Sequence, residues 1–563
     1  MKPTVFVLAS LVALSASAKW DYSQGGAPSG GGTHLLTDGN WQIGIEQMTG
    51  QMTGGWLLKK YKAGSGVLDL RMVESDCGVK IVQLHNGAME NVSGLTDVYL
   101  PNSVINLDGA TFKNCSALTQ VVLNEGLKAI GSANNNTFLD CKKLTTINFP
   151  STLEKIGKNA FQNCVELELT DFVLPVSVTT IDDHAFAGCT KITGSFTGPG
   201  VTTFAGEYHF EGANLTNVTF MNATTIPTGL CYKMKTLLSA NFGSGITSIG
   251  YRAFGDCSAL ETVTYGGPVE SIGGQAFSGC SAYVLGEHTF PVELKTIGDH
   301  AFAGCTKVTG PLTFPGLETV TGTYAFEKTE ILSFTAPNCT TIVQGMFKEC
   351  KKIQTVEFSP NVTQFGTDVF RNGGSSLVSF CPMSFPLLSG SFGSEVFHGQ
   401  KNLSIPVFDL SESAITELGG YAFADCHNVG TVKLPATLTT LGAGSLGYND
   451  GRLRAVWFYG PPPTTIGGKA LMPKERDTSK YWVLVAAKGH ATDWEAKVGT
   501  SITANDTIVP LGDGEDAAAK AAAATLGLTG VKPIGKWMHV DSGYTYWHWV
   551  VEELPKGLAI YIM

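Results

Sequence analysis

Charged residues and familiar catalytic patterns are scarce in this sequence of 563 residues. Charged side chains make up 15% of the chain and the formal net charge is −10, which argues against nucleic acid or an anionic membrane as a partner. No G-x-S-x-G, H-E-x-x-H, Walker A or EF-hand pattern occurs, and no C-x-x-C pair suggests a zinc or redox centre. We therefore expect no enzyme activity, no cofactor and no metal site.

Long apolar runs are also missing, except at the N-terminus. Lys2 precedes the apolar residues 4–14, and Ala16-Ser17-Ala18 follows as a small-residue cleavage site. This pattern predicts a signal peptide over residues 1–18, with cleavage before Lys19; a buried first strand is the alternative. No later segment approaches the roughly 20 apolar residues of a membrane span. The mature protein is therefore expected to be secreted or held at a cell surface, without a membrane span.

Internal repetition dominates the rest of the chain. Alanine-phenylalanine steps recur, and a cysteine often stands three residues after the phenylalanine, as in Phe161 with Cys164 and Phe254 with Cys257. An L-x-x-[VI]-x-[LF] segment often follows, and a period of about 20–29 residues with such a strand is typical of leucine-rich repeats. We call the phenylalanine position of each unit the landmark. Counting degenerate copies, this position recurs about every 24 residues. The landmarks are Met89, Phe112, Phe138, Phe161, Phe186, Phe210, Cys231, Phe254, Phe277, Phe302, Phe326, Phe347, Phe370, Phe397, Phe423, Leu446 and Leu471.

One block of this repeat occurs twice. The segment IDDHAFAGCTKITG at 181–194 returns as IGDHAFAGCTKVTG at 297–310, an offset of 116 residues. Residues 138–254 align with residues 254–370 at the same offset, which predicts a tandem duplication of five repeats. His184 and His300 occupy the same place in the two copies, so we expect them on turns and not in a reactive site.

A unit of about 24 residues cannot bury its apolar side alone, so the units must stack into a solenoid. In L-x-x-[VI]-x-[LF], the last two apolar positions are two apart and point into the coil, whereas the residue between them points outward. The phenylalanine and cysteine positions should fill the core on the opposite wall. The predicted fold is a β-rich leucine-rich-repeat solenoid, a curved right-handed array of about 17 coils with a parallel concave sheet and terminal caps.

The I-G-x-x-A-F-x-x-C-x-x-L runs, such as Ile156 to Leu167 and Ile249 to Leu260, resemble the BspA-type leucine-rich-repeat family of secreted and surface proteins. The resemblance covers about residues 67–495. It implies the solenoid fold and, because the family is associated with adhesion, a role in binding host proteins or other cells. Some units depart from the family pattern because they lack the cysteine, namely those of Phe210, Phe326, Phe370 and Phe397.

The ends of the chain differ from the repeats. We expect an N-terminal cap over residues 19–66, the array over residues 67–495 and a small C-terminal module over residues 496–563. In that module, residues 515–526 (EDAAAKAAAATL) predict a short helix. The module also holds an aromatic cluster, which either packs its core or binds sugar: Trp537, Tyr544, Tyr546, Trp547 and Trp549.

The outward strand positions are the predicted binding residues of the concave sheet. They are Tyr99, Asn148, Thr219, Asn241, Thr264, Thr335, Glu357, Lys433 and Trp457. Most are short and polar, so we expect a broad protein or glycan ligand on another cell or in the extracellular matrix, with the aromatic residues Tyr99 and Trp457 as anchors. This predicts an exported, adhesin-like binding protein. Two alternatives stay open: a structural or matrix spacer, and an enzyme or glycan-binding activity in the C-terminal module.

The thirteen cysteines are expected to be mostly buried free thiols, although the protein is exported. Equivalent side chains in a stacked column point in parallel, which disfavours the torsion of about 90° that a disulfide requires.

Overall fold

The computed structural model of the chain describes residues 19–26, 32–49, 54–131, 135–448, 453–471, 483–487, 489–500, 506–525, 527–528, 531–541 and 544–553. The predicted signal peptide, residues 1–18, lies outside the described residues. The chain divides into two compact units. Unit 1 is Met1–Leu215 with Thr219–Met221, and unit 2 is Thr216–Val218 with Asn222–Met563. The boundary falls inside β17 (Asn214–Phe220).

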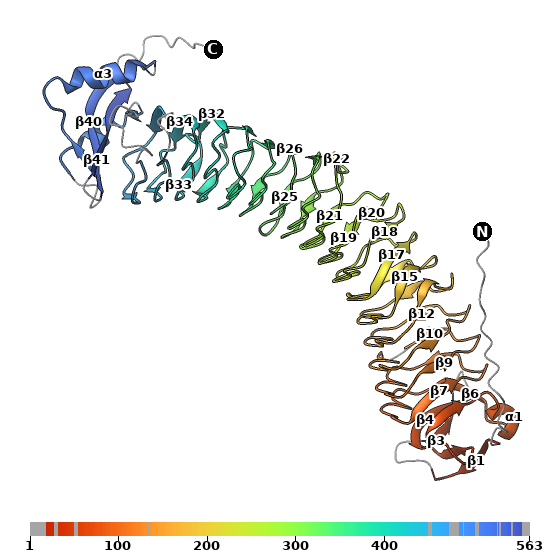
Figure 1. Cartoon of the computed structure of the whole chain (residues 1–563). Helices are drawn as coiled ribbons and strands as arrows, with labels where there is room; N and C mark the ends of the chain where they lie inside the picture. The colour runs from red at the N-terminus through yellow and green to blue at the C-terminus, as the bar shows by residue number, and fades with distance from the viewer. Residues whose placement is uncertain are drawn as a thin grey trace. The chain divides into compact units, whose positions relative to one another are not determined.

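Each unit is a stack of coils (Figure 1). Most regular coils contribute a longer strand to one parallel wall and a shorter strand to another. The chain is therefore a β-solenoid of about 17 turns with few helices, as the repeat predicted.

The longer strands form one wall of the coils. In β28 (Thr355–Phe358), Val356 and Phe358 are each 2% exposed, whereas Glu357 between them faces solvent. This alternation follows from the two-residue period of a strand and confirms the predicted inward and outward positions. In unit 1 the wall contains β5 (Gly66–Asp69), β7 (Leu95–Tyr99), β9 (Gln120–Val122), β11 (Thr146–Ile147), β13 (Thr170–Val173) and β15 (Thr193–Thr197). In unit 2 it contains β18 (Ser239–Phe242), β20 (Thr262–Thr264), β22 (His288–Thr289), β24 (Pro311–Thr313), β26 (Ser333–Ala336), β28, β30 (Ser379–Cys381), β32 (Ser404–Asp409), β34 (Asn428–Leu434), β36 (Ala455–Phe458) and β38 (Val483–Ala486).

The shorter strands form a second wall around the isoleucine-glycine steps. Ile156 is fully buried, and a Cβ on Gly157 would lie 2.7 Å from the backbone oxygens of Ile130 and Gly131, so the close approach of adjacent coils requires glycine. In unit 1 this wall contains β6 (Ile81–Leu84), β8 (Asn106–Leu107), β10 (Ala129–Ile130), β12 (Lys155–Ile156), β14 (Thr180–Ile181) and β16 (Thr203–Phe204). In unit 2 it contains β19 (Ser248–Ile249), β21 (Ser271–Ile272), β23 (Thr296–Ile297), β25 (Thr319–Val320), β27 (Thr341–Ile342), β29 (Gln364–Phe365), β31 (Ser389–Phe392), β33 (Ala414–Leu418), β35 (Thr440–Leu441) and β37 (Thr465–Ile466).

The third side of each coil is a run of turns that carries its own ladder. The amide of Phe277, for example, donates to the carbonyl oxygen of Ala301 in the next coil at 2.8 Å. His184 and His300 lie on these turns with φ of 52° and 51°, a left-handed conformation that histidine tolerates better than most residues. Each histidine Nδ1 lies against the preceding aspartate, at 2.9 Å from Asp183 and 2.8 Å from Asp299. The two copies of the repeated segment thus have matching local structure.

Phenylalanine rings stack along the core. Phe277 is 1% exposed, and its ring centroid lies 5.4 Å from that of Phe254 and 5.3 Å from that of Phe302. The rings are stacked at interplanar angles of 19° and 7°, because equivalent side chains repeat once per coil. The landmark residues therefore form a continuous column inside each unit.

The cysteines that follow the landmarks link neighbouring coils by hydrogen bonds. Cys280 Sγ donates to the carbonyl oxygen of Phe254, and Cys305 Sγ to that of Phe277, each at 3.0 Å. In a unit without the cysteine, Gln400 Nε2 instead donates to the carbonyl oxygen of Phe370 at 3.0 Å. Eleven of the thirteen cysteines are buried and all are free thiols, so the predicted burial is confirmed.

A short antiparallel sheet covers the N-terminal end of the array. Its strands pair in sequence order, and the last of them pairs in parallel with β6, so the sheet continues into the shorter-strand wall. The elements are β1 (Asp21–Gln24), β2 (His34–Thr37), β3 (Gln42–Gln47), β4 (Trp56–Ala63) and the helix α1 (Val73–Cys77).

The C-terminal residues extend the longer-strand wall of unit 2. The sheet order is β32-β34-β36-β38-β41-β40-β39, in which β41 is parallel to β38 and the last two pairings are antiparallel. The predicted helix is present over residues 515–525. The elements are α2 (Ala491–Glu495), β39 (Asp506–Val509), α3 (Glu515–Thr525), β40 (Val531–Asp541) and β41 (Tyr544–Glu553).

Candidate functional site

The outward side of the longer-strand wall, which we call the long-strand face, carries the predicted binding residues. All nine are exposed or half-buried. Eight lie in strands, from Tyr99 in β7 and Thr219 in β17 to Trp457 in β36, and Asn148 directly follows β11. Strand pairing within unit 2 brings several together as direct neighbours, namely Asn241 with Thr264, Thr335 with Glu357, and Lys433 with Trp457.

The long-strand face was expected on the concave side of the array. Within unit 2, Figure 1 shows β26, β32 and β34 along one side of the coils and β25 and β33 along the opposite side. The concave position of the long-strand face stays a prediction.

Two of the predicted residues in unit 1 already have structural partners. Asn148 accepts a hydrogen bond from the amide of Leu123 at 2.6 Å and donates one to the carbonyl oxygen of Leu123 at 2.8 Å. The guanidinium of Arg71 covers the ring of Tyr99, 4.4 Å from its centroid. The Asn148 side chain thus extends the ladder, and a ligand would meet Arg71 before it met the Tyr99 ring.

At the C-terminal end of unit 2, α3 packs on the long-strand face. Its buried Ala519 and Ala523 form a core cluster with Ala455, Val485 and Trp549 of the sheet below. The small alanine side chains let the helix lie close to the strands. Beyond the end of α3 the long-strand face is no longer covered, and the helix stands above the uncovered sheet.

The space beside the end of α3 forms a groove of about 800 Å³, which we call the Trp457 groove. The sheet side contributes Pro406, Val407, Asn428, Thr431, Lys433, Arg454 and Trp457, and the end of α3 and the residues after it contribute Thr525 and Leu528. Trp457 is half-buried and lies 6.4 Å, at 28°, from the ring of Tyr459. The groove thus offers an aromatic surface flanked by apolar and hydrogen-bonding side chains.

The groove is positively charged, although the net charge of the whole protein is −10. Arg454 is exposed and makes no ion pair with any described residue, and Lys433 Nζ lies 2.7 Å from Asp409 Oδ2. Burial alone would raise the pKa of Asp409, but hydrogen bonds from Lys433 and Ser411 outweigh it and hold this pKa below its ordinary value. No carboxylate is among the described residues that line the groove.

The aromatic residues of the C-terminal module divide into two groups. Trp537 and Trp549 are 1% and 4% exposed and therefore pack the core. The side chains of Tyr544, Tyr546 and Trp547 lie outside the described residues. Among the residues that the structure describes, no group of three His, Cys, Asp or Glu side chains is arranged to hold a metal ion.

Sequence reasoning found Lys433 and Trp457 but missed the rest of the groove. Arg454 lies between the buried Leu453 and the first residue of β36, so the strand alternation does not predict its exposure, and it carries no special sequence signal. The contribution of Leu528 depends on where α3 packs, which one sequence cannot show.

Comparison with known proteins identifies the repeat. The BspA type Leucine rich repeat region (6 copies) matches residues 71–168, 166–284, 282–404 and 390–456. The chain belongs to this family. No curated protein matches the chain.

Solved leucine-rich-repeat structures are similar to this chain at low identity. A leucine-rich-repeat protein from Bacteroides ovatus is 20% identical, with coverage of 79% of this chain and 93% of that chain and a TM-score of 0.37. A leucine-rich cell surface protein from Faecalibacterium prausnitzii is 20% identical, with coverage of 76% and 95% and a TM-score of 0.29. The pneumococcal vaccine antigen PcpA is 13% identical, with coverage of 83% and 96% and a TM-score of 0.34.

The family and the fold indicate a repeat protein with an interaction role. Within the part of the chain that the structure describes, no helix has the length and apolarity to span a membrane.

Proposed function

We propose that this chain is an exported, adhesin-like protein that binds a protein or glycan at a cell surface through the long-strand face of unit 2. The observation that carries the proposal is the Trp457 groove, in which a half-buried tryptophan and two cations interrupt an otherwise short and polar surface. Aromatic and arginine side chains at such positions dominate the energetics of many interfaces. The membership in a family of repeat proteins with interaction roles agrees with it.

Export is supported by the pattern of residues 1–18 and by the family. Free thiols are compatible with export here because eleven of the thirteen are held away from solvent; Cys77 and Cys381 are the exceptions. Expression in a secreting host, followed by mass measurement of the released protein, tests the cleavage. A mature chain that begins at Lys19 supports export, and retention of the intact N-terminus inside the cell contradicts it.

Binding is tested with immobilised cell-surface fractions, untreated, protease-treated or periodate-treated. We expect Trp457→Ala to weaken binding by at least about tenfold, as for an interface anchor. A Thr264→Arg/Glu357→Arg double variant tests whether the contact extends along the face. His300→Ala, on the turn side, is the control and should leave binding unchanged. Weakening by the His300 variant alone would place recognition on another side of the solenoid.

The two treatments separate the ligand classes. Loss of binding after protease treatment indicates a protein ligand, and loss after periodate treatment indicates a glycan. Retention of wild-type binding by both Trp457→Ala and the double variant would contradict the proposed site. Absence of binding to every fraction would favour the alternative of a structural spacer.

A further inference from the structure

The chemistry of the Trp457 groove points to one class of ligand. We infer that the groove binds an acidic carbohydrate chain, with a sugar ring on the Trp457 indole and a carboxylate on Arg454. This inference rests on the proposed function and deepens it by naming the ligand class. It is built from the aromatic surface, the charges of the lining and the state of the strand backbones.

The aromatic surface matches a sugar ring in shape and polarity. Trp457 is half-buried, so its indole is fixed in the sheet while one part remains open to the groove. The face of an indole is electron-rich, and the C–H groups on one side of a pyranose ring carry partial positive charge, so the two attract each other. Tyr459, 6.4 Å away and nearly parallel, supports the indole from the side.

The charge of the lining selects an anion. Arg454 and Lys433 are the charged residues in the described part of the lining, and both are cations. Lys433 is held by Asp409 at 2.7 Å, so its charge is largely compensated. Arg454 has no such partner among the described residues, and a guanidinium binds a planar carboxylate through two parallel hydrogen bonds. The positive potential thus centres on Arg454, in a protein whose net charge is −10.

The polar residues of the lining suit hydroxyl groups. Thr431 lines the groove with a hydroxyl. Asn428 Nδ2 already donates to the carbonyl oxygen of Lys401 at 3.0 Å and Thr525 Oγ1 to that of Ala522 at 2.7 Å, so these two side chains serve a sugar hydroxyl mainly as acceptors. Such neutral groups donate and accept hydrogen bonds, as sugar hydroxyls do. Val407 and Leu528 also line the groove, and their apolar side chains would contact the apolar edges of a bound sugar ring.

The strand backbones argue against an extended acidic peptide. β34 is paired on one side with β32 and on the other with β36, so its backbone groups are engaged in the ladder. A peptide strand therefore finds no open sheet edge there and lacks the main-chain hydrogen bonds that give strand addition its affinity. A carbohydrate needs side-chain contacts only, and these the groove supplies.

The test is a calorimetric titration of the full secreted chain with hexagalacturonate, a linear sugar acid. The matched probe is its fully methyl-esterified form, which keeps the rings but removes the charges. We expect the acid to bind at least about tenfold more tightly than the ester, because only the acid pairs with Arg454. Added salt should weaken binding of the acid, since a partly exposed ion pair is screened.

Matched variants locate the binding. Trp457→Ala and Arg454→Gln should each weaken binding of the acid by at least about tenfold. Trp457→Phe should retain part of the affinity, which separates loss of the ring from loss of folding. Lys307→Gln removes an exposed positive charge elsewhere on unit 2 and should have no effect.

Four outcomes would overturn the inference: no binding of hexagalacturonate at millimolar concentration, equal binding of the methyl ester, equal weakening by Lys307→Gln, or tighter binding of hexaglutamate than of the sugar acid. The last would assign the groove to acidic peptides. If cell-surface binding depends on Trp457 while hexagalacturonate does not bind, the proposed function stands and this inference fails. If surface binding ignores both Trp457 and the Thr264/Glu357 double change, the proposed function itself fails.

Discussion

Replacement of Phe277 by alanine removes one ring from the middle of the phenylalanine column in unit 2. Phe277 is 1% exposed and touches the rings of Phe254 and Phe302, and also that of Tyr283 at 4.9 Å. The change therefore leaves a cavity between neighbouring coils. The matched control is Thr264→Ala, on the exposed face of the coil that begins at Phe254.

The size of the effect follows from these contacts. A buried phenylalanine truncated to alanine costs about 3–5 kcal/mol, through lost transfer energy and the cavity that remains. Loss of three aromatic contacts places Phe277→Ala toward the upper part of this range. An exposed threonine changes stability by less than about 0.5 kcal/mol. We therefore expect a difference of about 4 kcal/mol between the two variants.

Hydrogen exchange measured by mass spectrometry reads this difference coil by coil. In a solenoid, each coil is stabilised by its neighbours, so the loss should be greatest in peptides from residues 254–302. A local loss of about 4 kcal/mol corresponds to an increase of roughly a thousandfold in the exchange rate of amides that open locally. Equal exchange in Phe277→Ala and Thr264→Ala would refute the assignment of inward and outward positions.

Three further predictions concern the core. Iodoacetamide should label the exposed Cys381 in the folded protein but should label Cys280, whose thiol pKa is raised by burial, only after denaturation without reductant; a Cys280–Cys305 disulfide would contradict this. Burial lowers the pKa of His209 from 6.5 to about 4, so the stability present above pH 6.5 should fall by about 3 kcal/mol as the pH drops toward 4, and His209→Gln should flatten this pH dependence of the urea midpoint. Gln400→Ala leaves the carbonyl oxygen of Phe370 without its side-chain donor and should lower the free energy of unfolding by about 1–3 kcal/mol, whereas Gln400→Cys should restore most of it.

The repeat pattern was sufficient to predict the coil. The spacing of Phe161 and Cys164 placed both in the core, and the alternation in L-x-x-[VI]-x-[LF] placed Glu357 outside, as the structure shows. These positions are predictable because the same packing pattern recurs in many repeats, so an assignment made in one repeat can be compared with the others. The hydrogen bonds of the thiols were not predicted, because they depend on the distance between coils.

The candidate site was predictable only in part. Trp457 stood out because a large aromatic residue is unusual at an outward position. The role of Asn148 as a ladder extension was missed, because an asparagine at a strand end reads equally well as a free polar group. The helix side of the groove was not predicted, because α3 reaches Trp457 only through tertiary packing. The alanine-rich composition of α3 does not indicate which surface the helix packs against.

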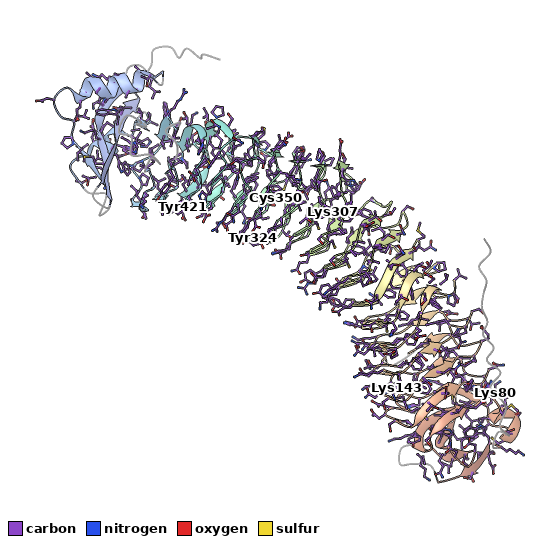
Figure 2. The ribbon with its side chains drawn as sticks, in the orientation of Figure 1. Lys80, Lys143, Lys307, Tyr324, Cys350 and Tyr421 are labelled. Carbon is purple, nitrogen blue, oxygen red and sulfur yellow. The ribbon has the colours of Figure 1, made fainter. Side chains whose placement is uncertain are left out.

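Recognition by the long-strand face of unit 2 is tested most directly by hydroxyl-radical footprinting of the full chain, free and bound to a cell-surface fraction. Tyr324 and Tyr421 lie along one edge of unit 2, on the turn side, and serve as internal references (Figure 2). We predict that binding protects Trp457 and Val407 from oxidation and leaves Tyr324 and Tyr421 unchanged. Protection of the two tyrosines with unaltered oxidation of Trp457 would contradict the assignment and move recognition to the turn side.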